Sequence, residues 1–439
     1  MTAPASTPAL ERNIGLIALT LYGVGDILGA GIYGLIGRAA GEMGHAIWLA
    51  FLVSMIAAGL TGLSYASLGS RFPRAGGAAY ISLRAYRKPF ISYMVGLAVL
   101  ASGLTSMATA AKVFGGYLNG LFPALPPLAI ALGFSLLIAG IVFRGIRESL
   151  FANGIFTLIE VSGLFLIVAA GLPYLGSVNY LDAATPQNLA GDISLSLALT
   201  GAVLTFYSFV GFEDMLNVAE EVKEPQKTLP RALLMAVLIA SLIYMTISLV
   251  AVSVLTPAAL ADSQKPLVDV AAQIAPWFPS SAFSLIALFA VANTALLNFV
   301  MGSRLLYGMA SHGLVPRVLS RVHATRHTPH LAIIAVWVIF VVLVLSGDIS
   351  SLARATSVLL LGCFVLVNGA LVVLKTRESW DGHFNIPIVV PVLGAIICLA
   401  MLSQAKQPEL LTAGAILAGI VALYFVMRPS GDALEHMDD

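Results

Sequence analysis

The chain has 439 residues, of which 59% are hydrophobic and only 10% are charged, and its mean hydropathy is +0.94. Water-soluble domains of this size carry far more charge, so the composition predicts a protein that crosses the lipid bilayer several times. The formal net charge of +1 leaves no basic surface for nucleic acid, which we exclude as a partner.

Apolar stretches of about 20 residues, the length that crosses roughly 30 Å of hydrocarbon, occur twelve times. They lie at residues 13–38, 45–69, 90–119, 126–144, 151–171, 193–219, 230–255, 280–310, 331–346, 352–374, 387–404 and 409–427. The sequence therefore predicts an all-α integral membrane protein with 12 transmembrane helices.

Lysine and arginine concentrate in alternate connections, and short basic loops stay on the cytoplasmic side of a membrane. The basic connections hold Arg71, Arg74, Arg84, Arg87, Lys88, Arg144, Arg147, Lys223, Lys227, Arg231, Arg317, Arg321, Arg326, Lys375 and Arg377, whereas the others hold only Arg38, Lys265, Arg354 and Lys406. This distribution predicts that the N-terminal segment (1–12) and the C-terminal tail (428–439) are both cytoplasmic. We expect the cell membrane as the location.

The first span contains an unusual stretch at residues 23–33, with four glycines and Asp26 near mid-depth. A membrane helix with this composition is expected to be broken there to hold a ligand. The amide groups of Gly29, Ala30 and Gly31 would then be bare, at a helix start suited to a carboxylate. The alternative is that these small residues only allow close helix packing, but Asp26 favours a site.

Two further spans carry polar groups at depth. In the third span, Ser102, Thr105, Ser106 and Thr109 either line a pathway or bond within their own helix. In the fifth span, Glu160 lies about nine residues in, roughly 13 Å from the cytoplasmic end. An ionisable group near the midplane is a functional hypothesis by default, and the alternative is a structural ion pair with Lys112 or Arg304.

The sixth span is also interrupted, because Gly211, Glu213 and Asp214 fall at mid-span. About 180 residues separate it from the interruption in the first span. Two interrupted spans at matching positions of two halves indicate an inverted-repeat transporter with its site at the interface.

No enzymatic chemistry is expected. The chain has no phosphate-binding loop of glycines with Lys and Ser or Thr, and its histidines lie outside the predicted membrane centre. We interpret His323, His327 and His330 as part of a solvated basic loop and not as a metal site. The sequence therefore predicts no cofactor, no metal and no catalytic residue.

Three motifs now point to a family. The segments 29–33, 209–226 and 303–316 resemble the first-helix glycine signature, the sixth helix with its following loop, and the eighth helix of the amino acid–polyamine–organocation superfamily. The resemblance implies a LeuT-type five-plus-five inverted repeat. The first repeat would span 13–171, the second 193–374, and two appended helices 387–427.

The resemblance also implies roles for individual residues. The substrate carboxylate would meet the amides near Gly29, Ala30 and Gly31, and its ammonium would meet carbonyls of Ile27, Tyr207 and Val210. Tyr207 or its neighbour Phe206 would close over the substrate as a lid.

Glu160 departs from the family pattern, in which many members carry a lysine seven residues after the asparagine that corresponds to Asn153. A carboxylate there either binds and releases a proton or helps to hold a cation such as sodium. Asp26 is a second coupling candidate. Glu213 would favour cationic substrates if it faces the pocket, and a helix-capping Glu213 would say nothing about the substrate.

These features together predict a secondary active transporter that moves an amino acid by alternating access, coupled to protons or working as an exchanger. The alternative within the class is an antiporter for polyamines or cationic amino acids. The alternative from another class is a transporter-like sensor that binds an amino acid without moving it.

Overall fold

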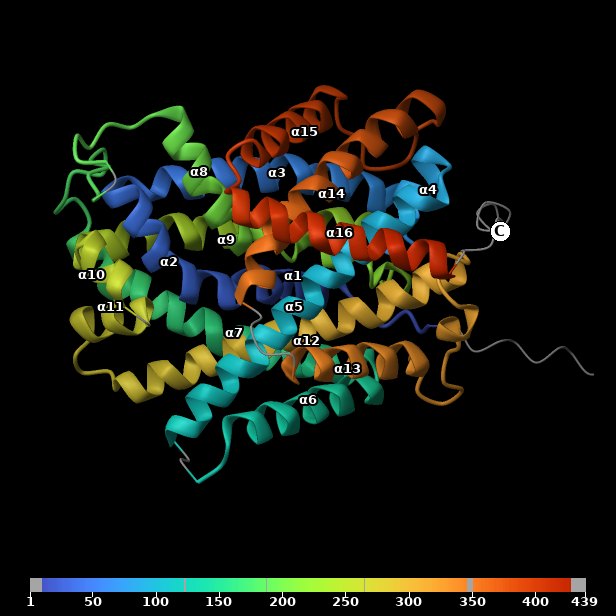
Figure 1. Cartoon of the computed structure of the whole chain (residues 1–439), viewed down its shortest axis with the longest axis horizontal. Helices are drawn as coiled ribbons and strands as arrows, with labels where there is room; N and C mark the ends of the chain where they lie inside the picture. Colours follow the sequence, from blue (N-terminus) through green and yellow to red (C-terminus); the bar gives the residue numbers. More distant parts are fainter. Residues whose placement is uncertain (1–9, 122–123, 187, 264, 346–349, 428–439) are drawn as a thin grey trace, which may run out of the picture.

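A computed structural model of the chain describes residues 10–121, 124–186, 188–263, 265–345 and 350–427. Residues 1–9 of the predicted N-terminal segment and the predicted tail at 428–439 lie outside this part. The described regular structure is helical, and most of the long helices run along one common direction (Figure 1).

The helices follow one another with few long connections. In chain order they are α1 (Leu16–Leu28), α2 (Ala30–Met43), α3 (Ile47–Arg71), α4 (Gly77–Tyr86), α5 (Pro89–Leu121), α6 (Pro127–Arg144), α7 (Ile146–Gly171), α8 (Leu195–Phe206), α9 (Pro225–Val254), α10 (Pro257–Asp262), α11 (Pro266–Ile274), α12 (Ser280–Ser311), α13 (His330–Leu345), α14 (Ser350–Arg377), α15 (Val389–Leu402) and α16 (Gln407–Met427). Short 3-10 turns lie between some of them, at η1 (Gly44–Ala46), η2 (Leu172–Tyr174), η3 (Tyr207–Phe209), η4 (Phe212–Leu216), η5 (Ala219–Glu221) and η6 (Arg317–Ser320).

Each of the twelve predicted apolar stretches contains a helix. Within the described part, ten candidate spans have the length and hydropathy to cross a membrane, and α13 and α15 are shorter apolar helices. Two predicted starts were wrong by five residues, since α7 begins at Ile146 and α9 at Pro225. These helices begin at a glycine cap or at a first-turn proline, before the hydrophobic stretch starts.

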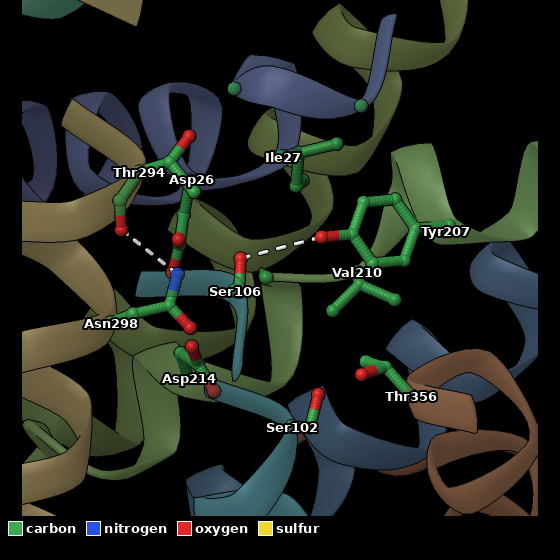
Figure 2. Close-up of a pocket in the computed structure, with 13 residues that line it drawn as sticks. Asp26, Ile27, Ser102, Ser106, Tyr207, Val210, Asp214, Thr294, Asn298 and Thr356 are labelled. Atoms are coloured by element: carbon green, nitrogen blue, oxygen red, sulfur yellow. Dashed lines mark hydrogen bonds between the residues drawn. The ribbon is translucent and has the colours of Figure 1, made fainter. Parts of the chain in front are cut away.

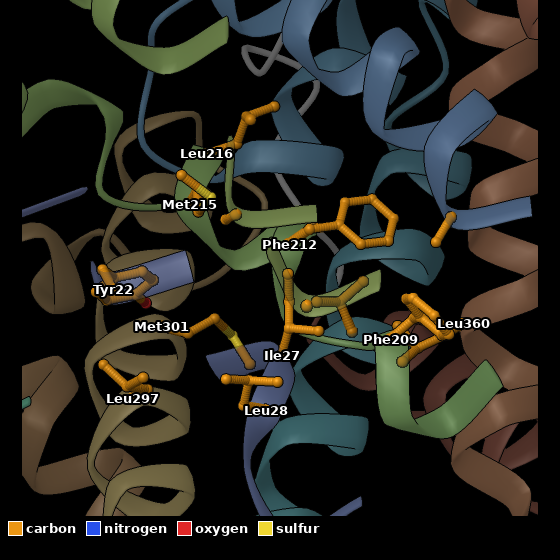
Figure 3. Packing of buried hydrophobic residues seen from close by; sticks show 14 of the residues in the cluster. Tyr22, Ile27, Leu28, Phe209, Phe212, Met215, Leu216, Leu297, Met301 and Leu360 are labelled. Atoms are coloured by element: carbon orange, nitrogen blue, oxygen red, sulfur yellow. The ribbon is translucent and has the colours of Figure 1, made fainter. Parts of the chain in front are cut away.

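The interior around α1 is packed with buried apolar side chains. Figure 3 shows Ile27 and Leu28 of α1 among such side chains from α12 and from the segment after α8. Small residues permit this close approach, as helix packing in membranes requires. A Cβ atom added to Gly23 would lie 2.6 Å from the Met215 sulfur, and one added to Gly31 would lie 2.8 Å from Ser208 Cα. The packing interpretation of these glycines therefore holds alongside the break in the helix.

Candidate substrate-binding site

The first helix break lies at Gly29, between the end of α1 and the start of α2. Its backbone angles, φ −38° and ψ −150°, are not helical. A Cβ atom there would lie 2.2 Å from the Thr294 hydroxyl oxygen, so only glycine fits beside α12. Since the first amides of a helix have no partner within it, α2 begins with bare N–H groups at Ala30 and Gly31.

The second break follows α8. After η3 the chain is extended at Val210 and then passes through Gly211 at φ +128°, a conformation that favours glycine. A Cβ atom at Gly211 would lie 2.9–3.0 Å from atoms of Asp26. The two breaks are therefore in direct van der Waals contact with each other.

A tyrosine from a third helix joins the two breaks. The hydroxyl of Tyr244, fully buried on α9, donates to the carbonyl oxygens of Ile27 and, at 2.8 Å, of Ser208. One hydroxyl proton is thus shared between two acceptors. This role could not be predicted from the sequence, because nothing in a single tyrosine within a mostly apolar helix indicates which distant carbonyls it will contact.

A small cavity lies where the breaks meet (Figure 2). Its lining comes from several helices and consists of Asp26, Ile27, Gly29, Gly31, Ser102, Ser106, Tyr207, Val210, Gly211, Asp214, Thr294, Asn298 and Thr356. The cavity measures about 30 Å³, which accommodates about two water molecules and is far too small for an amino acid. The structure therefore represents a conformation closed around the site.

Most of the residues expected at the site line this cavity. Ile27, Gly29, Gly31, Tyr207 and Val210 do so. The backbone of Ala30, whose side chain is outside the described atoms, continues from Gly29 into α2.

Of the two lid candidates, Tyr207 lines the cavity, with its hydroxyl 3.4 Å from the Ser106 oxygen. Phe206 is absent from the lining; it is fully buried and its ring packs 5.8 Å from that of Phe364.

The acidic residues after the second break point in different directions. Glu213 is buried and accepts a 2.9 Å hydrogen bond from the amide of Gly211, as the helix-capping alternative proposed. It does not line the cavity, and Asp214 does. The short 3-10 turn separates the two side chains, which the sequence alone does not reveal. Figure 2 shows Asp214 on the same side of the cavity as Asp26, and the two carboxyl groups interact electrostatically.

The polar face of α5 divides between its two interpretations. Ser102 and Ser106 line the cavity. Thr105 and Thr109 donate to backbone oxygens one turn earlier in α5, at 3.0 Å and 2.9 Å. Sequence reasoning missed the other polar lining residues, which are Thr294, Asn298 and Thr356.

Glu160 is fully buried on α7, and neither of its carboxyl oxygens has a hydrogen-bond partner among the described residues. The alternative that pairs it with Arg304 is wrong, because Arg304 pairs with Glu221 at 3.1 Å. Glu160 does not line the cavity. Its carboxyl group interacts electrostatically with the hydroxyl groups of Tyr33 on α2 and Tyr244 on α9.

A polar cluster on the same face of α7 supports α1. Thr157 donates to the Asn153 side chain at 3.1 Å, and Asn293 of α12 donates to Thr157 at 3.0 Å and to the Gly25 carbonyl at 3.3 Å. A Cβ atom on Gly25 would lie 2.1 Å from the Thr157 oxygen. Gly25 therefore lets α7 and α12 contact the α1 backbone just before its break.

Within the described part of the chain, no group of three or more His, Cys, Asp or Glu side chains has the arrangement of a metal site.

Comparison with known proteins gives a consistent result. The sequence model of a family described as "Amino acid permease" matches residues 14–427. The chain is 26% identical over 428 residues to the branched-chain amino acid permease BcaP of Bacillus subtilis, covering 92% of this chain and 90% of that protein. It is also 26% identical to the methylthioribose transporter of the same organism, covering 91% and 89%.

Plant and animal relatives are longer. The chain is 31% identical over 394 residues to the vacuolar cationic amino acid transporter 2 of Arabidopsis thaliana, covering 83% of this chain but only 60% of that protein. The mouse cationic amino acid transporter 4 is 28% identical, with 61% of its length covered. The chain thus spans about three fifths of the length of these cationic transporters.

Proposed function

Because this chain belongs to the amino acid permease family of the amino acid–polyamine–organocation superfamily, we propose that it is a secondary active transporter that carries an amino acid across a membrane by alternating access. The observation that supports this most directly is the contact between two broken helices at one closed cavity. Their bare backbone groups offer both charges that an amino acid backbone needs.

In this proposal the substrate carboxylate binds the amides at the start of α2, near Gly29, Ala30 and Gly31. The ammonium binds carbonyls at the ends of α1 and α8, which no longer serve a continuous helix. At Ile27 the ammonium would replace the Tyr244 hydroxyl, which would then donate to Ser208 alone. Binding would thus exchange one hydrogen bond for another.

The arrangement proposed for the whole molecule is the LeuT-type five-plus-five inverted repeat with twelve spans. It places the repeats at 13–171 and 193–374, the appended pair at 387–427 and both termini in the cytoplasm. The small cavity supports a cycle in which elements around it must separate to admit substrate. Tyr207, which lines the cavity from the second break, would act as the lid.

A second candidate function is transport of a cationic amino acid or polyamine. Among the described lining residues two are acidic, Asp26 and Asp214, and none is basic. Such a lining would attract a positively charged side chain. Several relatives named as cationic amino acid transporters agree with this possibility, whereas the branched-chain permease agrees with a neutral substrate.

For energy coupling we propose that Glu160 binds and releases a proton during the cycle. A buried carboxylate without a partner is costly, so the closed conformation favours the protonated form. A cation such as sodium held at Glu160 is the alternative coupling ion.

The test is counterflow in liposomes that contain the purified protein and a high internal concentration of one unlabelled amino acid. Leucine, alanine and lysine serve as substrates that separate the neutral and cationic proposals. A transporter accelerates entry of the labelled amino acid, and a sensor or a channel does not. A thermal-shift screen of the same protein identifies ligands independently, since a ligand that binds only the folded state raises the melting temperature.

A further inference from the structure

Asp26 and Asp214 form a carboxyl pair placed symmetrically about the two breaks. Asp26 lies three residues before Gly29, and Asp214 lies three residues after Gly211. Both are buried, with exposed fractions of 6% and 3%, and both line the cavity. They stand on the side of the breaks toward the N-terminal segment, where Ile14 bonds to Glu221 and Lys223 at 2.9 Å and 2.8 Å.

The two carboxyl groups interact electrostatically, and a hydrogen bond between them needs a proton, because two carboxylates have only acceptor atoms. One further oxygen on each residue, Asp26 Oδ2 and Asp214 Oδ1, is buried without a partner in the described part. Two charged carboxylates that line one small buried cavity would repel each other strongly. A proton held by the pair would remove this repulsion between α1 and η4.

A buried polar group that does not line the cavity also interacts with the pair. Tyr22, one turn before Asp26 on α1, is fully buried and its hydroxyl has no partner among described residues. Its electrostatic neighbours are Asp26, Asp214, Arg304 and Glu221. The hydroxyl therefore interacts electrostatically both with the carboxyl pair and with the buried ion pair of Arg304 and Glu221.

The charged and titratable groups around the pair come from several elements. They are Glu213 on η4, Tyr22 on α1, Arg304 on α12, Glu221 on η5 and Tyr65 on α3. Arg304 is already paired with Glu221 at 3.1 Å, and Glu213 is a third acid, whose carboxylate accepts a hydrogen bond from the Gly211 amide. Neither provides a counter-ion that would let Asp26 and Asp214 both ionise while in contact.

We propose that Asp26 and Asp214 are a proton-binding site that closes the cavity on the side toward the N-terminal segment. The pair holds α1 against η4 when one proton is shared and releases them when that proton leaves. The inference rests on the proposed function, in which this side faces the cytoplasm. Release of the proton would open the cavity toward the N-terminal segment, with Tyr22 as the polar group nearest the pair on that route.

The test measures access to the cavity from the cytoplasmic face. Ser102→Cys places a thiol in the cavity lining, and the two native cysteines, Cys363 and Cys398, are buried. Inside-out membrane vesicles receive a charged, membrane-impermeant thiol reagent between about pH 5.5 and pH 8.5, and the chain without the added cysteine gives the background rate. Because the thiolate fraction itself rises with pH, each rate is divided by that of the same cysteine in Asp26→Asn.

We expect this ratio to be near one at low pH and to rise at least about tenfold at high pH, since like charges in contact disfavour the closed arrangement. The asparagine amide donates to Asp214 without titrating, so that variant should stay closed throughout. Asp214→Asn provides the same comparison from the other side if Asp26→Asn does not fold. Glu224→Gln, an exposed carboxyl change, is the matched control and should behave as the parent.

A ratio that does not change with pH would overturn the proposal. So would closure by added sodium at high pH, which would assign the pair to a metal cation. Counterflow measured on the same protein separates this inference from the proposed function. Normal counterflow without pH-dependent access would reject the proposal that the carboxyl pair closes the cavity. pH-dependent access without counterflow would reject the proposed transport function and support the proposal for the carboxyl pair.

Discussion

The Tyr244 hydroxyl connects the two breaks, and Tyr244→Phe isolates its contribution. The variant keeps the ring and its packing against Phe51 and Phe209. It removes the hydroxyl proton that the buried carbonyls of Ile27 and Ser208 share. Loss of a donor to buried acceptors costs about 1–3 kcal/mol, which we expect as the loss of stability.

For a chain of 439 residues, each kcal/mol corresponds to about 1 °C in melting temperature, so the expected decrease is about 1–3 °C. Substrate affinity should change by less than about threefold. The reason is that the hydroxyl makes about one hydrogen bond in both states, shared when the site is empty and directed to Ser208 when ammonium occupies Ile27. Binding is measured by calorimetry or by displacement of a labelled substrate.

The matched control is Tyr93→Phe, whose hydroxyl contacts only the weakly accepting sulfur of Met427 at 3.4 Å among described residues. It should leave the melting temperature within about 0.5 °C of the parent. An unchanged melting temperature for Tyr244→Phe, together with a tenfold change in affinity, would refute the reasoning. The hydroxyl would then belong to the substrate contact and not to the joint between the breaks.

Four further predictions concern the cavity lining, the breaks and the buried charged groups near them. Glu160→Gln keeps the side-chain shape but cannot release a proton, so it should abolish accumulation driven by a pH gradient while preserving binding; accumulation at the parent level would remove Glu160 from coupling. Tyr207→Ala should weaken substrate affinity about tenfold by removing an aromatic wall, whereas Tyr207→Phe should not, and equal effects would argue against the lid. Gly211→Ala forces a Cβ atom to within 3.0 Å of Asp26 at φ +128°. We expect the free energy of unfolding, measured by thermal unfolding, to fall by about 1–3 kcal/mol. An unchanged stability would mean that the two breaks lie further apart. Glu221→Gln leaves the buried Arg304 without its charge partner and should destabilise by about 3–5 kcal/mol, and the double variant with Arg304→Met should recover much of this in the same melting assay.

The sequence predicted the positions of the breaks because they depend on local chemistry. Glycines at 29 and 211 remove side chains within otherwise apolar spans, and no neighbouring segment is needed to notice this. Length and hydropathy likewise located a helix within every predicted stretch. The starts of α7 and α9 were less accurate, since Gly145 and Pro225 act through capping and not through hydrophobicity.

The details of the site depended on contacts between distant segments. Glu213 and Asp214 are adjacent, and which of them faces the cavity is set by a 3-10 turn after Gly211. Helical periodicity does not apply to such a turn, so Asp214 could not be chosen over Glu213 from the sequence. Arg304 was considered a partner for Glu160, but a glutamate 83 residues earlier in the chain takes that place.

The small size of the cavity limits how transport can begin. A ligand shifts a conformational equilibrium only by its different affinity for the two states. An amino acid cannot enter about 30 Å³, so it must first bind a conformation in which α1, α2 or the segment after α8 has moved. Among the groups that hold these elements together in the empty state are the Tyr244 hydroxyl and, in the proposal above, the proton shared by Asp26 and Asp214. An ammonium that binds the Ile27 carbonyl would replace the Tyr244 hydroxyl there, and a proton that leaves the carboxyl pair would separate Asp26 from Asp214. Substrate binding and proton release would therefore be coupled through α1 itself, without a separate transmitting element.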